Sequence, residues 1–207
     1  MRMSCLSVLF VFGLCACACA QRVSGTADAE RRATEVILSD ESAGVLAGVC
    51  ISYTQPIWRK GYEDFLTAMQ GRYTRLGNGF WTTLDTVGPL QIGGVAVAAG
   101  SYYLGLRIGK DAAVSLLLFD SRQTMQARLL PGSTPLYTGE ALPQIVVPLT
   151  FAQNVRKDEV SKLAIELSAD ASEPSKGSLV IRWGRHELKA AVHFDLAASK
   201  PTATDKK

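Results

Sequence analysis

Aromatic and basic side chains gather in one stretch of the first half of the chain. The set comprises Trp58, Arg59, Lys60, Tyr73, Arg75, Asn78 and Trp81, with Arg72 and Phe80 between them. An aromatic ring offers a flat apolar face, and a guanidinium offers a forked donor that fits a carboxylate or phosphate. A binding surface for sugars or anions needs this combination. The alternative is structural, with Trp81 and Tyr73 in the core and Arg75 bound to unpaired backbone carbonyls.

The segment around Arg75 is rich in glycine and is expected to form an irregular loop. Gly71, Gly77 and Gly79 lie close together, and glycine is favoured where dihedral angles are unusual or chains approach closely. The five donors of one guanidinium can bind several carbonyls of such a loop. We therefore predict that Arg75 is largely buried, bonded to backbone carbonyls or to one acidic side chain, with Asn78 capping the same turn. In the competing hypothesis, Arg75 is a ligand anchor that is open to solvent.

No standard catalytic or metal-binding motif is found. His186 and His193 have a spacing that suits no metal site, and both are expected to be exposed. Glu63 and Asp64 are adjacent in a predicted helix, so they point in different directions and fit a solvated surface better than an acid–base pair. Motifs for nucleotide binding, zinc proteolysis and serine hydrolysis are missing. We expect no metal site and no cofactor.

The N-terminus predicts export. Arg2 precedes an apolar run, Cys5–Leu14, which as a helix reaches about 15 Å, half of a bilayer. The run is therefore a signal sequence rather than a spanning helix. Two processing sites compete, one leaving Gln21 at the N-terminus and one a lipobox that makes Cys17 the acylated residue. The expected location is the periplasm, or the outer membrane with a lipid anchor and the protein facing the periplasm.

Cysteine content and charge limit the possible partners. Four of the five cysteines lie in the leader, and the remaining Cys50 is expected to be a small strand residue rather than a nucleophile. The formal net charge of +3 is too weak to imply nucleic acid. No later segment is long and apolar enough to span a membrane. The expected partner is a small molecule, a glycan or an envelope protein.

The body of the chain alternates between apolar and polar residues with a period of two. In Leu188–Leu196, for example, Val192 and Phe194 fall on one face and Lys189 and His193 on the other. Further alternating segments are Val49–Tyr53, Tyr102–Ile108, Ile145–Phe151 and Leu163–Leu167, and turns are expected at Gly93-Gly94, Gly109–Asp111 and Gly184-Arg185. Because Pro148 cannot donate a ladder hydrogen bond, its strand is expected at an edge or a bulge.

These elements predict an all-β fold. We expect an antiparallel β-sandwich or barrel of about nine strands, with one short helix over Tyr62–Gln70 after the second strand and a turn of helix within Asp120–Leu130. The predicted divisions are a signal peptide at 1–20, a polar tether at 21–32, a single domain at 33–197 and a disordered tail at 198–207.

The order of several short motifs resembles a known family. These motifs are Ile51–Pro56 with Arg59–Gly61, Arg75–Asn78 running into Trp81–Asp85, Leu90–Gly94, Ala99–Leu104 and Leu179–Trp183. Together they resemble the bacterial exported family called domain of unknown function 2911, over roughly Gly44–Asp195. The chain departs from the family pattern at Tyr73–Arg75, Gly77-Asn78 and Thr54-Gln55. The resemblance implies an exported all-β protein and no established activity.

Three functions follow from this sequence as hypotheses. The favoured one is a non-enzymatic binding module of the envelope, which should contain an aromatic-lined pocket. The second is a hydrolase of an envelope polymer or glycan, which should show a polar cleft with at least two titratable groups of shifted pKa. The third is an assembly accessory that uses an exposed strand edge, such as the strand containing Pro148.

Overall fold

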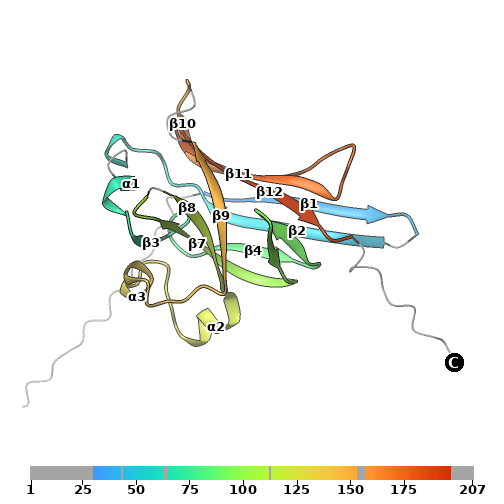
Figure 1. Ribbon diagram of the computed structural model, residues 1–207, viewed down its shortest axis with the longest axis horizontal. Helices are drawn as coiled ribbons and strands as arrows, with labels where there is room; N and C mark the ends of the chain where they lie inside the picture. The colour runs from blue at the N-terminus through green and yellow to red at the C-terminus, as the bar shows by residue number, and fades with distance from the viewer. Residues whose placement is uncertain (1–29, 43, 63–64, 112, 153–156, 197–207) are drawn as a thin grey trace, which may run out of the picture.

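The computed structural model describes residues 30–42, 44–62, 65–111, 113–152 and 157–196. The expected signal peptide, Cys17 and the C-terminal tail lie outside these residues. The strands, labelled in Figure 1 where there is room, are β1 (Arg31–Asp40), β2 (Gly44–Thr54), β3 (Arg72–Arg75), β4 (Thr82–Thr86), β5 (Leu90–Ile92), β6 (Val95–Val97), β7 (Gly100–Ile108), β8 (Val114–Asp120), β9 (Ile145–Ala152), β10 (Val160–Ala169), β11 (Lys176–Gly184) and β12 (His186–Phe194). The helices are η1 (Lys60–Tyr62), α1 (Phe65–Ala68), α2 (Ser121–Gln126) and α3 (Thr134–Thr138). None of the helices in this part of the chain is long and apolar enough to cross a membrane.

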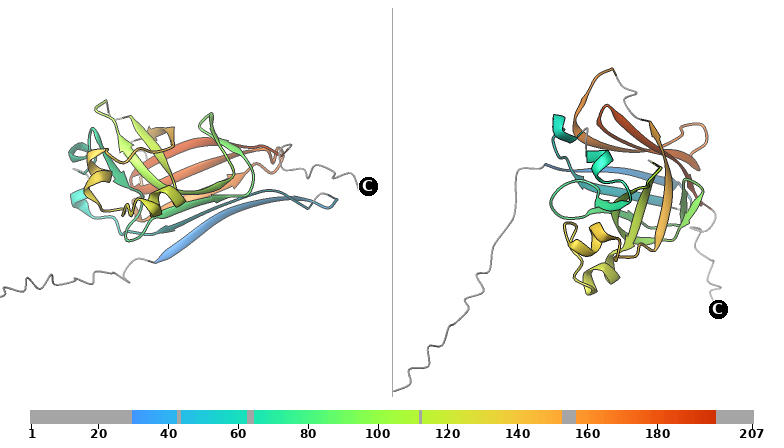
Figure 2. Two further views of the ribbon diagram at one scale, coloured as in Figure 1. Left: turned by 90° about the horizontal axis from the view of Figure 1, so that it is seen from below. Right: turned by 60° about the vertical axis from the view of Figure 1, so that its left-hand side comes forward.

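The strands form one antiparallel sheet that folds over itself into two layers (Figure 2). The order is β1-β2-β4-β7-β8-β9-β12-β11-β10, with β3 beside β7, β5 beside β12 and β6 beside β5. Strand β9 joins the layers, because Ile145–Leu149 pair with β8 and Thr150–Ala152 pair with β12. β9 therefore lies inside the sheet order rather than at its edge. Pro148 sits opposite Ser115 in the half of β9 that follows β8.

The two ends of the sheet order nearly meet, which makes the sheet almost a closed barrel. The backbone N–H of Leu167 in β10 donates to Thr34 Oγ1 in β1 at 3.1 Å. Farther along, the segment after β2 pairs with the start of β10, since Trp58 N–H donates to the Ser161 carbonyl at 2.7 Å and Leu163 N–H donates to the Pro56 carbonyl at 3.1 Å. The all-β fold predicted from the sequence is confirmed.

The alternating pattern places the main core between the layers. In β12, Leu188, Val192 and Phe194 are buried, while Lys189 and His193 are exposed, as the sequence predicts. A second, smaller cluster lies on the outer side of β7 and β8, beneath the segment that holds α2 and α3. It contains Trp81, Tyr103, Leu117, Phe119 and Leu136.

Several elements differ from the sequence expectation. A single helix was expected over Tyr62–Gln70, and the described residues there form the short η1 and α1. Glu63 and Asp64 lie outside the residues that the structure describes. Arg72–Arg75, expected as loop, forms β3 and pairs with β7. Strand β1 begins at Arg31, inside the segment predicted to be a tether. The helical turn expected after Asp120 is present as α2, capped by the Asp120 carboxylate, which accepts from Gln123 N–H at 2.7 Å.

Candidate functional site

One end of the barrel contains a cavity of about 240 Å³. Its lining comes in part from β3, which lies at the left in Figure 1, from the segment after β2, and from the residues on either side of the β11–β12 turn. Its lining residues are mainly apolar: Pro56, Trp58, Tyr62, Thr74, Arg75, Leu76, Gly77, Asn78, Leu106, Ile108, Val114, Tyr137, Phe151, Leu163, Ile181, Trp183, His186 and Leu188. An apolar protein cavity of about 150 Å³ can hold a benzene molecule, so this one has room for a small organic ligand.

Trp58 is the centre of an aromatic cluster in the cavity wall. Its ring centroid lies 5.1 Å from that of Trp183 in an edge-to-face arrangement and 5.8 Å from that of Tyr62. The indole also lies directly on the backbone of Gly184, because a Cβ atom added there would come within 2.5 Å of the ring. Gly184 has a φ of +61°, which the β11–β12 turn requires and which L side chains rarely adopt. Glycine at this position thus permits both the turn and the close approach of Trp58.

His186 and Trp183 lie on the two strands that flank this turn. Trp183 Nε1–H donates to the Pro56 carbonyl at 3.1 Å, which fixes the indole against the closing segment. The His186 ring lies 5.5 Å from Trp58 and 5.8 Å from Phe151. The expectation that His186 is exposed is therefore wrong: it is 9 % exposed, because its strand turns it inward and Trp58 covers it.

Arg75 and Asn78 are half-buried residues of the cavity lining. Arg75 Nη2 donates to Asn78 Oδ1 at 3.2 Å, and the same oxygen accepts from Gly79 N–H at 2.9 Å. Asn78 N–H donates to Thr54 Oγ1 at 2.8 Å, which ties the loop to the end of β2. The prediction that Asn78 caps the turn next to Arg75 is confirmed.

Arg75 is half-buried, and its described hydrogen-bond partner is the Asn78 side chain rather than the predicted backbone carbonyls or acidic side chain. Threonine hydroxyls from neighbouring strands bind the loop carbonyls instead: Thr82 Oγ1–H donates to the Leu76 carbonyl at 2.6 Å, and Thr54 Oγ1–H donates to the Asn78 carbonyl. The guanidinium is not needed there. It lies at the cavity with an amide oxygen as its described hydrogen-bond partner.

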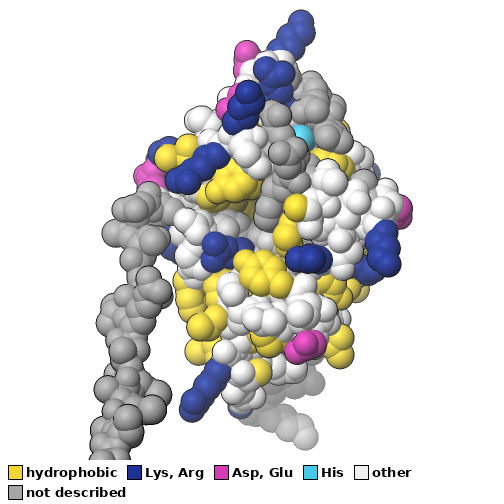
Figure 3. All heavy atoms as spheres, turned by 90° about the vertical axis from the view of Figure 1, so that its left-hand side faces the viewer, with side chains coloured by type: hydrophobic (Ala, Val, Ile, Leu, Met, Phe, Trp, Pro, Cys, Tyr) yellow, Lys and Arg dark blue, Asp and Glu magenta, His cyan; other side chains and the backbone are white. Residues whose placement is uncertain are grey.

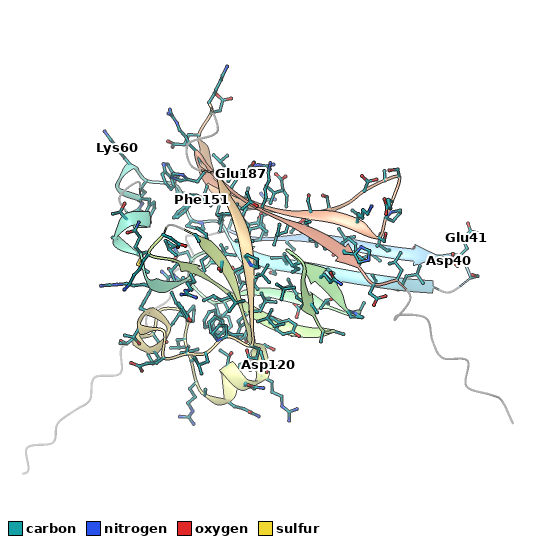
Figure 4. The ribbon with its side chains drawn as sticks, in the orientation of Figure 1. Asp40, Glu41, Lys60, Asp120, Phe151 and Glu187 are labelled. Carbon is teal, nitrogen blue, oxygen red and sulfur yellow. The ribbon has the colours of Figure 1, made fainter. Side chains whose placement is uncertain are left out.

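The residues singled out from the sequence separate into three places. Trp58, Arg75 and Asn78 line the cavity. Arg59 and Lys60 are exposed outside it, and Figure 4 shows Lys60 pointing away from the barrel.

Tyr73 and Trp81 belong to the outer hydrophobic cluster. The Trp81 ring stacks on Tyr103 at 5.3 Å, and its Nε1–H donates to the Leu129 carbonyl at 3.2 Å. Trp81 is thus a core residue, as the structural alternative expects, whereas Tyr73 is half-buried against the same cluster.

Sequence reasoning missed several lining residues. Tyr137, Phe151, Trp183 and His186 come from α3, β9, β11 and β12. Strand alternation marks Phe151 as inward, but no local signal shows that these distant segments meet. Figure 3 shows this end of the molecule, where hydrophobic side chains lie between Lys and Arg side chains.

An ion-pair network lies on the outer face of β10, β11 and β12. Arg182 binds Glu187 at 2.7 Å and Glu166 at 2.5 Å, and Lys189 binds Glu187 at 2.7 Å. Lys189 and Arg182 lower the pKa of the Glu187 carboxyl, and the two glutamates raise the pKa of Arg182. These residues alternate with inward-facing Ile181, Trp183 and Leu188, so the network stabilises the back of the cavity wall.

Within the part of the chain that the structure describes, the groups with a shifted pKa lie outside the cavity lining, whereas the hydrolase hypothesis places at least two of them in a cleft. Cys50, Tyr102, Asp170, Arg182 and Glu187, whose pKa values are shifted, all lie elsewhere. Burial, Glu35 and Asp85 raise the pKa of the Cys50 thiol, which keeps it protonated and unreactive. Across the described ranges, no group of three or more His, Cys, Asp or Glu side chains could hold a metal ion.

Comparison of the chain with family models, with curated proteins and with solved structures finds no match in any of the three. The resemblance to domain of unknown function 2911 therefore stays a prediction. Function has to be argued from the nearly closed barrel and its cavity.

Proposed function

We propose that this protein is an exported binding protein of the bacterial envelope whose ligand is a small molecule held in the barrel cavity. The observation that carries the proposal is the cavity of about 240 Å³, lined by aromatic and aliphatic side chains with a few polar groups. Small-molecule sites are typically concave and mostly apolar, with a few polar groups that orient the ligand. Barrels of about eight strands have an interior that can hold one small ligand.

The cavity wall is rigid in the way a binding site requires. Its apolar residues project from paired strands, and Trp183 is fixed by its hydrogen bond to Pro56. Trp58 is fixed by its backbone bond to Ser161 and by close packing on Gly184. A preformed site loses little conformational entropy when a ligand binds. A ligand in an apolar cavity gains packing contacts with the side chains of its wall.

Binding of small aromatic and aliphatic molecules, such as phenylacetate, indole and hexanoate, tests this proposal. Titration followed by calorimetry and by tryptophan fluorescence should show saturable binding, because Trp58 and Trp183 line the cavity. The variant Ile181→Phe places a ring in the cavity and should weaken binding by about tenfold or more. Val146→Phe is the matched control, since Val146 is exposed on β9 and outside the cavity lining.

Both variants must retain the cooperative unfolding transition of the wild type. If folded Ile181→Phe binds as tightly as the wild type and Val146→Phe, the ligands do not occupy the cavity. The proposal is then wrong.

Export is part of the proposal and rests on the leader pattern. The expected mature N-terminus is Gln21 or acylated Cys17. Intact-mass measurement of the protein from its native host distinguishes these two forms. A mature chain that retains Met1–Leu14 would contradict export.

A further inference from the structure

We infer that the ligand is a small amphipathic monocarboxylate: its acidic group binds Arg75, and its apolar body, one or two rings or a short acyl chain, fills the cavity. This inference rests on the proposed function and specifies the chemistry of the same site.

The charge of the cavity lining favours an anionic ligand. Among the lining residues that the structure describes, Arg75 is the one with a permanent charge at neutral pH, and none is Asp or Glu. The ion pairs found within the described residues do not include Arg75. A half-buried cation without a counter-ion is costly, and a carboxylate ligand would remove that cost. The site is therefore complementary to an anion and unfavourable for a cation.

The loop holds the Arg75 guanidinium in a defined orientation. Asn78 Oδ1 accepts from Arg75 Nη2 and from Gly79 N–H, so the loop orients the side chain. One of the five guanidinium donors is used in this bond, and the others can bind both oxygens of one carboxylate. Asn78 also has an amide nitrogen, and Tyr137 a hydroxyl, as further donors in the lining. This donor set suits a planar carboxylate better than a neutral amide.

The aromatic cluster in the cavity wall fits an apolar group better than an ammonium group. Quaternary ammonium ligands are bound over open aromatic faces. Here Trp58 and Trp183 meet edge to face, and Tyr62 lies 4.7 Å from Trp183, so the rings pack on one another. The remaining wall consists of aliphatic residues, among them Leu106, Ile108 and Leu163. This wall fits an apolar body and offers no cage for an ammonium group.

Matched ligand pairs test the inference. We would measure the Kd of phenylacetate and phenylacetamide, and of hexanoate and hexanamide, by calorimetry at neutral pH with the mature protein. In each pair the acid and the amide have nearly the same shape. The acid should bind about tenfold or more tightly than the amide. Arg75→Gln should bring this ratio close to one while leaving the amide's Kd nearly unchanged.

Two further variants complete the design. Arg75→Lys keeps the charge and removes the fork, so it should retain part of the preference and keep the test usable if Arg75→Gln fails to fold. Arg59→Gln is the matched control, because Arg59 is an exposed cation outside the lining, and it should keep the full preference.

The outcomes separate the inference from the proposed function. Equal Kd values for acid and amide in the wild type, with binding lost in Ile181→Phe, would overturn the inference and leave the cavity as a binding site. Tighter binding of benzylamine than of phenylacetate would overturn it as well, and so would a full acid preference in folded Arg75→Lys and Arg75→Gln. Failure of all ligands to bind would overturn both.

Discussion

The two ends of the barrel interior use the same packing device with different results. In β11, Gly177 lies under the Phe194 ring near one end, and Gly184 lies under the Trp58 indole at the other. Around Phe194 the interior is filled, because β5 pairs with β12 there and adds Leu90 and Ile92 to the core. Around Trp58 a cavity remains, with Arg75 and Asn78 in its lining. A glycine under an aromatic ring sets how closely two segments approach, and the side chains added by neighbouring segments decide whether the space between them is filled.

The filled end should show the largest loss on truncation. Phe194 is 1 % exposed, so Phe194→Ala should lower the free energy of unfolding by about 3–5 kcal/mol. Chemical denaturation measures this loss. His193→Ala, on the exposed face of the same strand, is the control and should change stability by no more than about 0.5 kcal/mol. Similar losses in both variants would mean that the strand register is wrong.

Leucines in the two regions should respond differently to truncation. Leu163 lines the cavity and Leu104 lies in the filled core, and both are buried. Because Leu163 already borders empty space, Leu163→Ala should cost about 2 kcal/mol, whereas Leu104→Ala should cost about 4 kcal/mol. Denaturation of the two variants under the same conditions gives the difference. A larger loss for Leu163→Ala would show that the cavity is not open in the free protein.

The outer ion-pair network should make the cavity end sensitive to acid. The pKa of Glu187 is lowered in the folded state by Lys189 and Arg182, so its ion pairs stabilise the fold above the ordinary carboxyl pKa of about 4.3. That contribution is lost as the pH falls through the lowered pKa. Glu187→Gln should therefore cost about 1 kcal/mol at pH 7, and the difference from the wild type should shrink towards zero at lower pH. Melting curves across this range measure it, and a constant difference would contradict this origin.

The smallest change in stability is expected for Arg75→Lys. The loop carbonyls are bound by Thr54 and Thr82, so the guanidinium contributes mainly its bond to Asn78. Losing that bond should lower the free energy of unfolding by about 0.5 kcal/mol. A melting curve checks this value. A drop of several degrees would mean that Arg75 organises the loop after all.

Much of the strand pattern could be predicted because it depends on neighbouring residues. Period-two alternation located β12 and its inward residues, and Gly93-Gly94 and Gly184-Arg185 marked two turns that the structure contains. Each of these signals is local: a face alternates with every residue, and a glycine permits a tight turn wherever it occurs.

The features that were missed depend on distant partners. The sequence of β3, Arg72–Arg75, has no apolar alternation, and the segment becomes a strand because β7 offers it a ladder. His186 is buried because Trp58, far away in the sequence, packs over it. The cavity itself could not be predicted, since it is bounded by segments that only the closed sheet brings together. Of the polar residues, Arg75 was singled out from the sequence. Thr54 and Thr82, whose hydroxyls bind the loop carbonyls in place of the guanidinium, were not.

The seam that closes the sheet has a consequence for how the chain reaches its native state. Thr34 and Leu167, which bond across the seam, are 133 residues apart, and Trp183 bonds to a carbonyl 127 residues away. Contacts between such distant residues form slowly, and β-proteins dominated by them fold in milliseconds to seconds. Until the segment after β2 pairs with the start of β10, both expose unpaired backbone groups that can pair with another chain. Refolding yield should therefore fall as protein concentration rises, because closure within one chain competes with association between chains.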